Sequence, residues 1–269
     1  MLNIENIVTP LFVPANRPER FGKAAVSGAD SIILDLEDAV AADAKEYARK
    51  TLTCDFTDLP VIVRVNSEGS SWHIEDLQAV SQLPIAAVML PKAEDPQQVK
   101  SVFEAMGGNI PIIALIETAL GVSNAGNIAA TKGVKRIAFG SVDFCADLGC
   151  AHLREILLPI RSELIMASRL AGIAAPIDGV TTALDDLNIS FDDSVHAKNL
   201  GFTGKLCIHP KQIGEVKRAF LPSKAEIIWA KKIVSSGDGA ISVDGEMVDE
   251  PVRIHARAIL ARSEVAETF

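Results

Sequence analysis

Short apolar runs alternate with amphipathic segments along the first 210 residues of the chain. Segments with helical periodicity separate the runs, such as the one that opens at Asp95 with proline next in the sequence. Strict alternation of strand and helix predicts a parallel sheet. The runs are rich in β-branched residues, as in strands buried on both faces, and number eight: Leu11–Val13, Ser31–Leu34, Val61–Val65, Ala86–Leu90, Ile112–Ile116, Arg136–Phe139, Ile173–Ile177 and Lys205–Ile208.

Eight strand–helix units in this length favour an α/β fold of the (β/α)8 TIM-barrel type. The alternative is a doubly wound sheet, but no G-x-G-x-x-G follows the first strand, so a dinucleotide-binding fold lacks its signature. One predicted helix carries Phe191 and Val195 and is expected to begin at a capping box formed by Ser190 and Asp193.

Three further helical stretches follow the last predicted strand. We therefore divide the chain into a barrel domain at 1–220 and a C-terminal helical extension at 221–269. The link between the last two helices, SSGDGAISVDGEMVDE, is polar and rich in turn residues. Such a link is typical of a mobile lid or of an arm that contacts a neighbouring subunit.

Composition and charge narrow the classes of partner. The chain has 269 residues, is 48% hydrophobic and carries a net charge of −9, without a long Lys/Arg run, which argues against a nucleic-acid or membrane-surface partner. No apolar run approaches the ~20 residues needed to cross a bilayer, and no signal sequence is evident, so we expect a cytoplasmic protein. The four cysteines have no C-x-x-C spacing and are expected to be reduced thiols.

Two carboxylates follow neighbouring predicted strands. Glu117 comes directly after the fifth run, and Asp143 lies shortly after the sixth, beyond Gly140, whose lack of a side chain lets the backbone approach a ligand. Parallel strands joined by a right-handed crossover bring both acids to the same rim. They are candidate ligands of Mg²⁺, which favours one or two carboxylates plus water and substrate oxygens. The alternative is a pair of unrelated surface acids that cap helices.

Arg64 lies within VIVRVN, a sequence otherwise suited to a buried strand, so its guanidinium needs an anionic partner. That partner is either a structural one, Glu37 or Asp38, or a substrate carboxylate or carbonyl held by a bidentate clamp. Lys92 is expected to pair with one of the acids, and His209 to be a structural hydrogen-bonding group. Because no G-x-S-x-G elbow or Cys/His pair is evident, metal-assisted carbonyl chemistry fits better than an acyl-enzyme.

Seven motifs in order resemble the citrate lyase beta-subunit-like proteins of the HpcH/HpaI aldolase family. They are LFVPANRPERF, IILDLEDAV followed by Lys45 and Arg49, VIVRVN, VMLPKAED, IIALIETALGV, IAFGSVDF and GFTGKLCIHPKQI. The resemblance implies a (β/α)8 barrel, usually trimeric or hexameric. It also implies an Mg²⁺-dependent enzyme that cleaves or forms carbon–carbon bonds in 3-hydroxyacyl-CoA thioesters such as citryl-CoA, malyl-CoA or citramalyl-CoA, with an oxo acid and acetyl-CoA as the fragments.

The resemblance also implies roles for individual residues. It places the metal on Glu117 and Asp143, with Glu117 and Gly140 against the substrate, and it assigns Arg64 to the oxo acid or its carbonyl oxygen. Residues that match the coenzyme A contacts of relatives are Phe12, Arg17 and Lys23.

Two further catalytic candidates come from the same comparison of motifs. Asp38 stands where aldolases of free hydroxy-oxo acids carry a histidine base, and this departure favours the CoA-thioester branch. Asp249, in the motif GEMVD, resembles the aspartate that an adjacent subunit delivers to the acetyl carbon; the alternative is a helix cap. Competing functions are thioester hydrolysis at the same site, and a subunit that acts on an acyl-carrier-protein thioester within a citrate lyase complex. A regulatory pseudoenzyme is disfavoured because each charged position that the chemistry needs is occupied.

Overall fold

Eight parallel strands form a closed barrel in the computed structural model, which describes residues 4–237 and 239–266. They pair in sequence order, and the last returns to the first, where Phe12 N donates to Cys207 O at 2.9 Å. The TIM-barrel prediction is therefore confirmed. The strands are β1 (Pro10–Pro14), β2 (Ser31–Asp35), β3 (Val61–Arg64), β4 (Ala87–Leu90), β5 (Ile112–Ile116), β6 (Val134–Phe139), β7 (Ile177–Asp178) and β8 (Gly204–Lys205).

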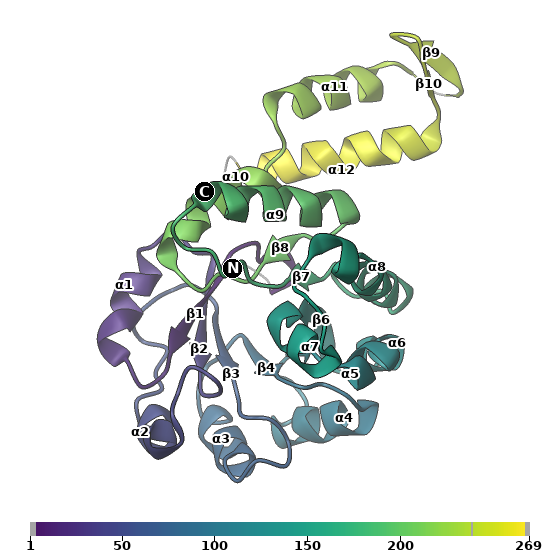
Figure 1. Cartoon of the computed structure of the whole chain (residues 1–269). Coiled ribbons are helices and arrows are strands. Elements are labelled where there is room, and N and C mark those ends of the chain that lie inside the picture. Colours follow the sequence, from purple (N-terminus) through teal and green to yellow (C-terminus); the bar gives the residue numbers. More distant parts are fainter. Residues whose placement is uncertain (1–3, 238, 267–269) are drawn as a thin grey trace. The chain divides into compact units, whose positions relative to one another are not determined.

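Helices follow each strand and surround the barrel (Figure 1). Two helices follow β5 and two follow β6, where the sequence predicted one segment each. The helices that follow the strands are α1 (Phe21–Ala25), α2 (Lys45–Lys50), α3 (His73–Val80), α4 (Pro96–Ala105), α5 (Ala119–Ser123), α6 (Ala125–Ala129), α7 (Ser141–Leu148), α8 (Arg154–Leu170), α9 (Leu187–Leu200) and α10 (Ile213–Phe220).

Inward-facing aliphatic side chains fill the barrel, among them Ile33, Ile62, Ile113 and Leu206. In a TIM barrel, side chains from all the strands pack together inside the barrel and form an apolar core. Burial on both faces explains why most of them appear in the sequence as continuous apolar runs. The strands thus hold the residues that follow them at fixed positions around one rim.

Arg136 is a charged side chain within this apolar interior, and it is fully buried in β6. Its guanidinium donates to carbonyls of Ile4 (3.1 Å), Ile7 (2.6 Å) and Ala175 (2.8 Å), and to Thr203 Oγ1 (2.7 Å). Burial lowers its pKa to about 10. All four partners precede strands, so Arg136 fastens together the amino end of the barrel, opposite the rim that carries the predicted site.

The seventh and eighth strands are shorter than predicted. The strand expected at Ile173–Ile177 is observed at Ile177–Asp178. The backbone N–H of Ile173 donates to Ser168 O at 3.2 Å, so Ile173 still belongs to the end of α8. Pro176 has no N–H with which to pair in a sheet. The eighth runs over Gly204–Lys205, and Cys207 adds a single bridge to Leu11.

Residues from Arg218 onward form a second compact unit, while Met1–Lys217 belong to the barrel unit. The second unit contains α11 (Lys224–Ser235), β9 (Ile241–Val243), β10 (Glu246–Val248) and α12 (Glu250–Ala266). It has its own small core, formed by Ala230, Ile233, Val248, Ala256 and Ile259. In the described ranges, no helix is long and apolar enough to cross a membrane.

Candidate active site

Arg64 is the centre of a cluster of carboxylates at the ends of β2 and β3. Asp35 ends β2 directly beside Arg64, so the strand register alone makes them neighbours. The guanidinium is held in bidentate fashion, with Nε 2.7 Å from Asp35 Oδ1 and Nη2 2.7 Å from Asp35 Oδ2. Its Nη1 lies 3.0 Å from Glu37 Oε2 and 3.5 Å from Asp38 Oδ2. The cluster therefore fixes the side chain before any ligand arrives.

Both predicted partners contact Arg64, but Asp35 holds it most closely. Burial alone would favour a neutral guanidinium, yet the facing carboxylates of Asp35, Glu37 and Asp38 raise the pKa of Arg64 above its usual value. Of the five N–H donors of an arginine, hydrogen bonds to Asp35 and Asp38 engage three, one of them on Nη2, which leaves the second N–H of Nη2. Arg64 is thus a fixed cation with a remaining donor.

Lys92 connects this cluster to Glu117. Its Nζ is 2.9 Å from Glu37 Oε1, which agrees with the predicted pairing to an acid. Its backbone N–H donates to Glu117 Oε1 at 2.8 Å, and this requires a left-handed conformation with φ of 46°. Such a conformation is unfavourable for a residue with a Cβ, so the contacts on both sides of Lys92 must hold it.

Glu117 is a buried carboxylate with an unsatisfied oxygen. It directly follows β5 and is 1% exposed, and its Oε2 is buried with no hydrogen-bond partner in the described structure. Burial, with the nearby charges of Glu37 and Asp143, raises the pKa of Glu117 to about 8. Such a group is stabilised either by a proton or by a cation at Oε2.

Gly140 leaves the space that Glu117 occupies. A Cβ at position 140 would lie 2.4 Å from Glu117 Cβ and 2.5 Å from its Oε2. Gly140 also caps α7, whose first turn contains the partly buried Asp143. The structure thus brings together Glu117, Gly140 and the helix of Asp143, as the strand-end argument predicted.

These residues fit a magnesium ion better than a transition metal. The charge of Asp143 contributes to the raised pKa of Glu117, so the two carboxylates lie near each other, and Glu117 Oε2 is buried without a hydrogen-bond partner. Among the described residues, no group of three or more His, Cys, Asp or Glu side chains is arranged to hold a metal. A closed protein cage is not needed for Mg²⁺, which keeps several waters and substrate oxygens in its coordination sphere.

The residues predicted to contact coenzyme A lie on β1 and the segment after it. The Phe12 ring stacks on the guanidinium of Arg64, with 4.9 Å from ring centroid to Cζ. Arg17 is exposed and pairs with Glu19 at 2.6 Å, and Lys23 is exposed on α1. Phe12 therefore belongs to the Arg64 cluster, while the two cations face solvent on the adjacent segment.

Asp38 and Asp249, the other two catalytic candidates, have different surroundings. The side chain of Asp38 is 57% exposed at the edge of the Arg64 cluster. Asp249 lies in the second unit between β10 and α12, where its Oδ1 accepts the N–H of Val252 at 3.4 Å. This is a helix-capping contact, the alternative considered for Asp249, and it leaves Oδ2 for other partners. Its role in catalysis stays a prediction.

Lys45, a residue without an expected function, supports the loop after β2. Its buried Nζ donates to the carbonyls of Leu36 and Glu37 and to Asn66 Oδ1, each at 2.7 Å. These bonds shape the backbone from which Glu37 and Asp38 extend. In the sequence, the only sign of this role is that Lys45 belongs to one of the motifs that resemble the family. Its spacing alone is that of a lysine on the exposed face of a helix.

Two other strand-end residues have structural partners. Asp178 is fully buried, and Lys205 and Arg161 lower its pKa despite the opposing effect of burial. His209 Nδ1 accepts the N–H of Lys211 at 3.1 Å in a capping box, which confirms its predicted structural role.

Comparisons with known proteins match the chain over most of its length. Residues 9–210 match the family model described as HpcH/HpaI aldolase/citrate lyase. A citrate lyase subunit beta-like protein from Mycobacterium tuberculosis is 36% identical over 268 residues, which cover 94% of each chain. A (3S)-malyl-CoA thioesterase from Cereibacter sphaeroides is 33% identical over 274 residues, 96% of this chain and 95% of that one.

Solved structures give the same picture. CitE from Mycobacterium tuberculosis in complex with magnesium, acetoacetate and coenzyme A superimposes with a TM-score of 0.87 at 35% identity, over 97% of this chain and 100% of that one. A citrate lyase beta subunit from the same organism, complexed with oxaloacetate and magnesium, gives a TM-score of 0.73 at 35% identity, over 82% of this chain and 100% of that one.

Proposed function

Since the chain belongs to the HpcH/HpaI aldolase/citrate lyase family, we propose that it is a magnesium-dependent carbon–carbon lyase. Its substrate would be a 3-hydroxyacyl-CoA thioester such as citramalyl-CoA, malyl-CoA or citryl-CoA, and its products an oxo acid and acetyl-CoA. The observation that supports this most is the buried free oxygen of Glu117 beside a fixed arginine. The solved relatives with magnesium and oxaloacetate or with coenzyme A support the same chemistry.

Glu117 and Asp143 would hold the metal. A bound Mg²⁺ would supply Lewis-acid stabilisation of negative charge on the substrate oxygens. The chain itself keeps Glu117 in place, through the N–H of Lys92 at 2.8 Å and through the space left by Gly140.

Arg64 would orient the oxo-acid part of the substrate and stabilise the oxygen that becomes negative. Its remaining Nη2 donor needs no reorganisation, because Asp35, Glu37 and the Phe12 ring already fix the guanidinium. Preorganised donors of this kind contribute most when charge develops in the transition state. On cleavage, the substrate hydroxyl would lose its proton to the exposed carboxylate of Asp38 and become the carbonyl of the oxo acid, while the electron pair of the broken carbon–carbon bond passes to the thioester fragment as an enolate.

We further propose that Asp249 returns a proton to that enolate carbon, giving acetyl-CoA, and removes it in the condensation direction. Phe12, Arg17 and Lys23 would contact coenzyme A, with the two exposed cations near its phosphates.

In a trimer or hexamer, Asp249 would reach the site of an adjacent subunit. Mixing Asp249→Ala and Glu117→Gln subunits after mild dissociation should then restore part of the activity; no recovery from fully exchanged subunits would contradict action between subunits.

Thioester hydrolysis is the second candidate, because a (3S)-malyl-CoA thioesterase is among the relatives. At this site, hydrolysis would use the same metal and arginine but would transfer the acyl group to water. A third is action on a carrier-protein thioester, since the citrate lyase subunit beta of Leuconostoc mesenteroides is 33% identical over 277 residues.

Product analysis separates the three. Purified protein would be incubated with citryl-, malyl-, citramalyl- and methylmalyl-CoA, with Mg²⁺ or with EDTA, and both products quantified. The proposal expects acetyl- or propionyl-CoA plus an oxo acid, only with Mg²⁺ and not with Glu117→Gln. The exposed Glu104→Gln serves as a matched control and should be fully active. Release of the free hydroxy acid would indicate the thioesterase, and inactivity on every CoA ester would overturn the lyase proposal for free thioesters.

A further inference from the structure

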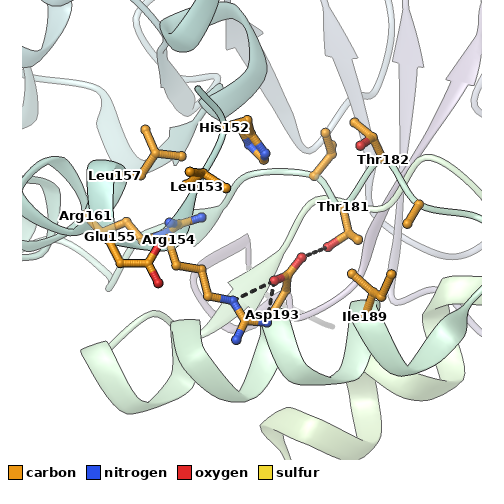
Figure 2. Close-up of a pocket in the computed structure, with 12 residues that line it drawn as sticks. His152, Leu153, Arg154, Glu155, Leu157, Arg161, Thr181, Thr182, Ile189 and Asp193 are labelled. Carbon is orange, nitrogen blue, oxygen red and sulfur yellow. Dashed lines mark hydrogen bonds and ion pairs between the residues drawn. The ribbon is translucent and has the colours of Figure 1, made fainter. Parts of the chain in front are cut away.

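A pocket lies between α8, α9 and the loop after β7, and its lining residues are other than those of the cluster of Arg64 and Glu117. It is a cavity of about 370 Å³. Figure 2 shows the Arg154 side chain next to Asp193, which also contacts Thr181, with His152 and Thr182 farther along the lining. The volume is at the lower end of the ~300–1,000 Å³ of small-molecule sites. It suits a metabolite somewhat larger than a free phosphate.

Arg161 presents an unsatisfied donor in this pocket. Its side chain is only 6% exposed, and its Nε and Nη2 contact the two carboxylate oxygens of Asp178 at 2.8 and 3.5 Å. Its Nη1 is buried and has no hydrogen-bond partner in the described structure. A buried guanidinium nitrogen without a partner is costly, and an anion in the pocket would satisfy it.

The amino end of α8 faces the same pocket. This helix is 17 residues long, and its N-cap, Leu153, provides no side-chain hydrogen bond to the first turn. Leu153, Arg154 and Glu155 all line the cavity. Backbone N–H groups and the positive end of the helix dipole therefore favour negative charge here.

Charged side chains of both signs line the pocket, Arg154 and Arg161 against Glu155 and Asp193. Arg154 pairs with Asp193 at 2.6 Å, and Lys205 pairs with Asp178 at 2.9 Å, so both aspartates are already neutralised. The pKa of His152 is lowered, first by burial and then by the charges of Arg161 and Lys205, whose effect exceeds that of the two aspartates. Glu155, exposed at the pocket, is the opposing charge.

We propose that this pocket binds a small metabolite through an oxyanion, a phosphate or a carboxylate group, held by Arg161 Nη1, Arg154 and the first turn of α8. The hydroxyl of Thr182 would add a neutral donor at its wall, whereas Thr181 Oγ1 already donates to Asp193 Oδ2 at 2.7 Å. The lining residues come from the segments that follow β6 and β7, at the carboxyl rim of the barrel, where barrels of this type bind their ligands. The inference does not depend on the proposed lyase activity.

Isothermal titration calorimetry of the full-length protein without Mg²⁺ tests it. Inorganic phosphate, glucose 6-phosphate and succinate are the probes, and they distinguish phosphate from carboxylate as the source. Arg154→Gln should weaken binding of the preferred probe by about tenfold, as expected for one charge-assisted hydrogen bond. The matched control is Arg169→Gln, which removes an exposed arginine at the other end of α8 and should change nothing.

Two more variants act in opposite directions. Glu155→Gln removes the opposing carboxylate and should tighten binding several-fold. Ala183→Glu adds a carboxylate at the pocket and should abolish binding. Ala105→Glu, at an exposed position on α4, is its matched control and should bind as the wild type does. A merely destabilised fold would weaken binding in every variant and could not tighten it. Absence of binding to the wild type for all three probes, or equal affinities of the Arg154→Gln and Arg169→Gln proteins, would overturn the proposal.

Discussion

The substitution Gly140→Ala tests the candidate metal site with a single added methyl group. The new Cβ would lie 2.4 Å from Glu117 Cβ and 2.5 Å from its Oε2, distances that real contacts essentially never show. Gly140 has φ of −86°, which alanine also adopts, so the change acts through this contact and not through backbone strain. Glu117 must therefore retreat by about 1 Å, and a displacement of that size can cost about 10²-fold in rate.

Magnesium affinity and turnover would be measured together for Gly140→Ala. Titration calorimetry gives the dissociation constant for Mg²⁺, and the thioester assay gives kcat; both should worsen, with kcat lower by about 10²-fold, or about 2.7 kcal/mol. The matched control is Gly126→Ala on α6, where an added Cβ meets nothing within 4 Å. It should keep full activity and gain stability. Wild-type magnesium affinity in a folded Gly140→Ala protein would refute the account of this site.

Three further predictions concern proton binding, the arginine clamp and the base of the barrel. Because the pKa of Glu117 is raised from 4.5 to about 8, the metal-free protein should lose stability as pH rises through that interval, with Mg²⁺ reversing the loss. Thermal melts of wild type and Glu117→Gln, which should lack this pH dependence, check it. Arg64→Lys keeps the charge but loses the bidentate contact with Asp35, so kcat should fall by about 10²–10³-fold while circular dichroism shows a folded protein. Arg136→Met should lower the free energy of unfolding in urea by about 3 kcal/mol, since it leaves buried carbonyls unpaired. Lys135→Met, at an exposed position, should change it little.

The barrel could be predicted because its strands are buried on both faces. Burial on both sides forces continuous apolar runs such as Ile112–Ile116, and the observed β5 has the same bounds. The seventh strand was placed too early because Ile173 and Ile177 look alike in a pattern of apolar residues. In the structure, Ile173 still bonds to the end of α8, and Pro176 stands between it and the strand. The sequence pattern does not show where α8 ends, so it cannot distinguish Ile173 from Ile177.

Local signals failed where two neighbouring residues offered the same chemistry. The capping box predicted at Ser190 and Asp193 is wrong, because α9 begins at Leu187 and Asp186 accepts the N–H of Asn188 at 3.0 Å. Ser190 lies inside the helix, and Asp193 pairs with Arg154. Any of these side chains can cap a helix, and tertiary contacts decide which one does.

The polar link in the C-terminal unit contains structure that composition concealed. Its residues form the hairpin of β9 and β10, with Asp244 and Gly245 at positive φ of 53° and 87° in the turn. An Asp-Gly pair between short alternating segments is a hairpin signal, and it was outweighed by the polarity around it.

The candidate site was predictable in its position but not in its contacts. Strand ends predicted that Glu117 and the helix of Asp143 would meet, because parallel strands share one rim. That Asp35 would hold Arg64, or that the backbone of Lys92 would turn its N–H onto Glu117, depends on register and on an unusual φ. Neither leaves a mark in the hydrophobic pattern.

The central claim is that Glu117 and Asp143 bind one divalent cation beside Arg64. Crystals soaked in Mn²⁺ and oxaloacetate, with data collected at the manganese absorption edge, test it most directly. The account predicts one strong anomalous peak within coordinating distance of Glu117 Oε2 and an Asp143 oxygen, and no such peak in Glu117→Gln crystals. A peak elsewhere, or none with oxaloacetate bound, would contradict it.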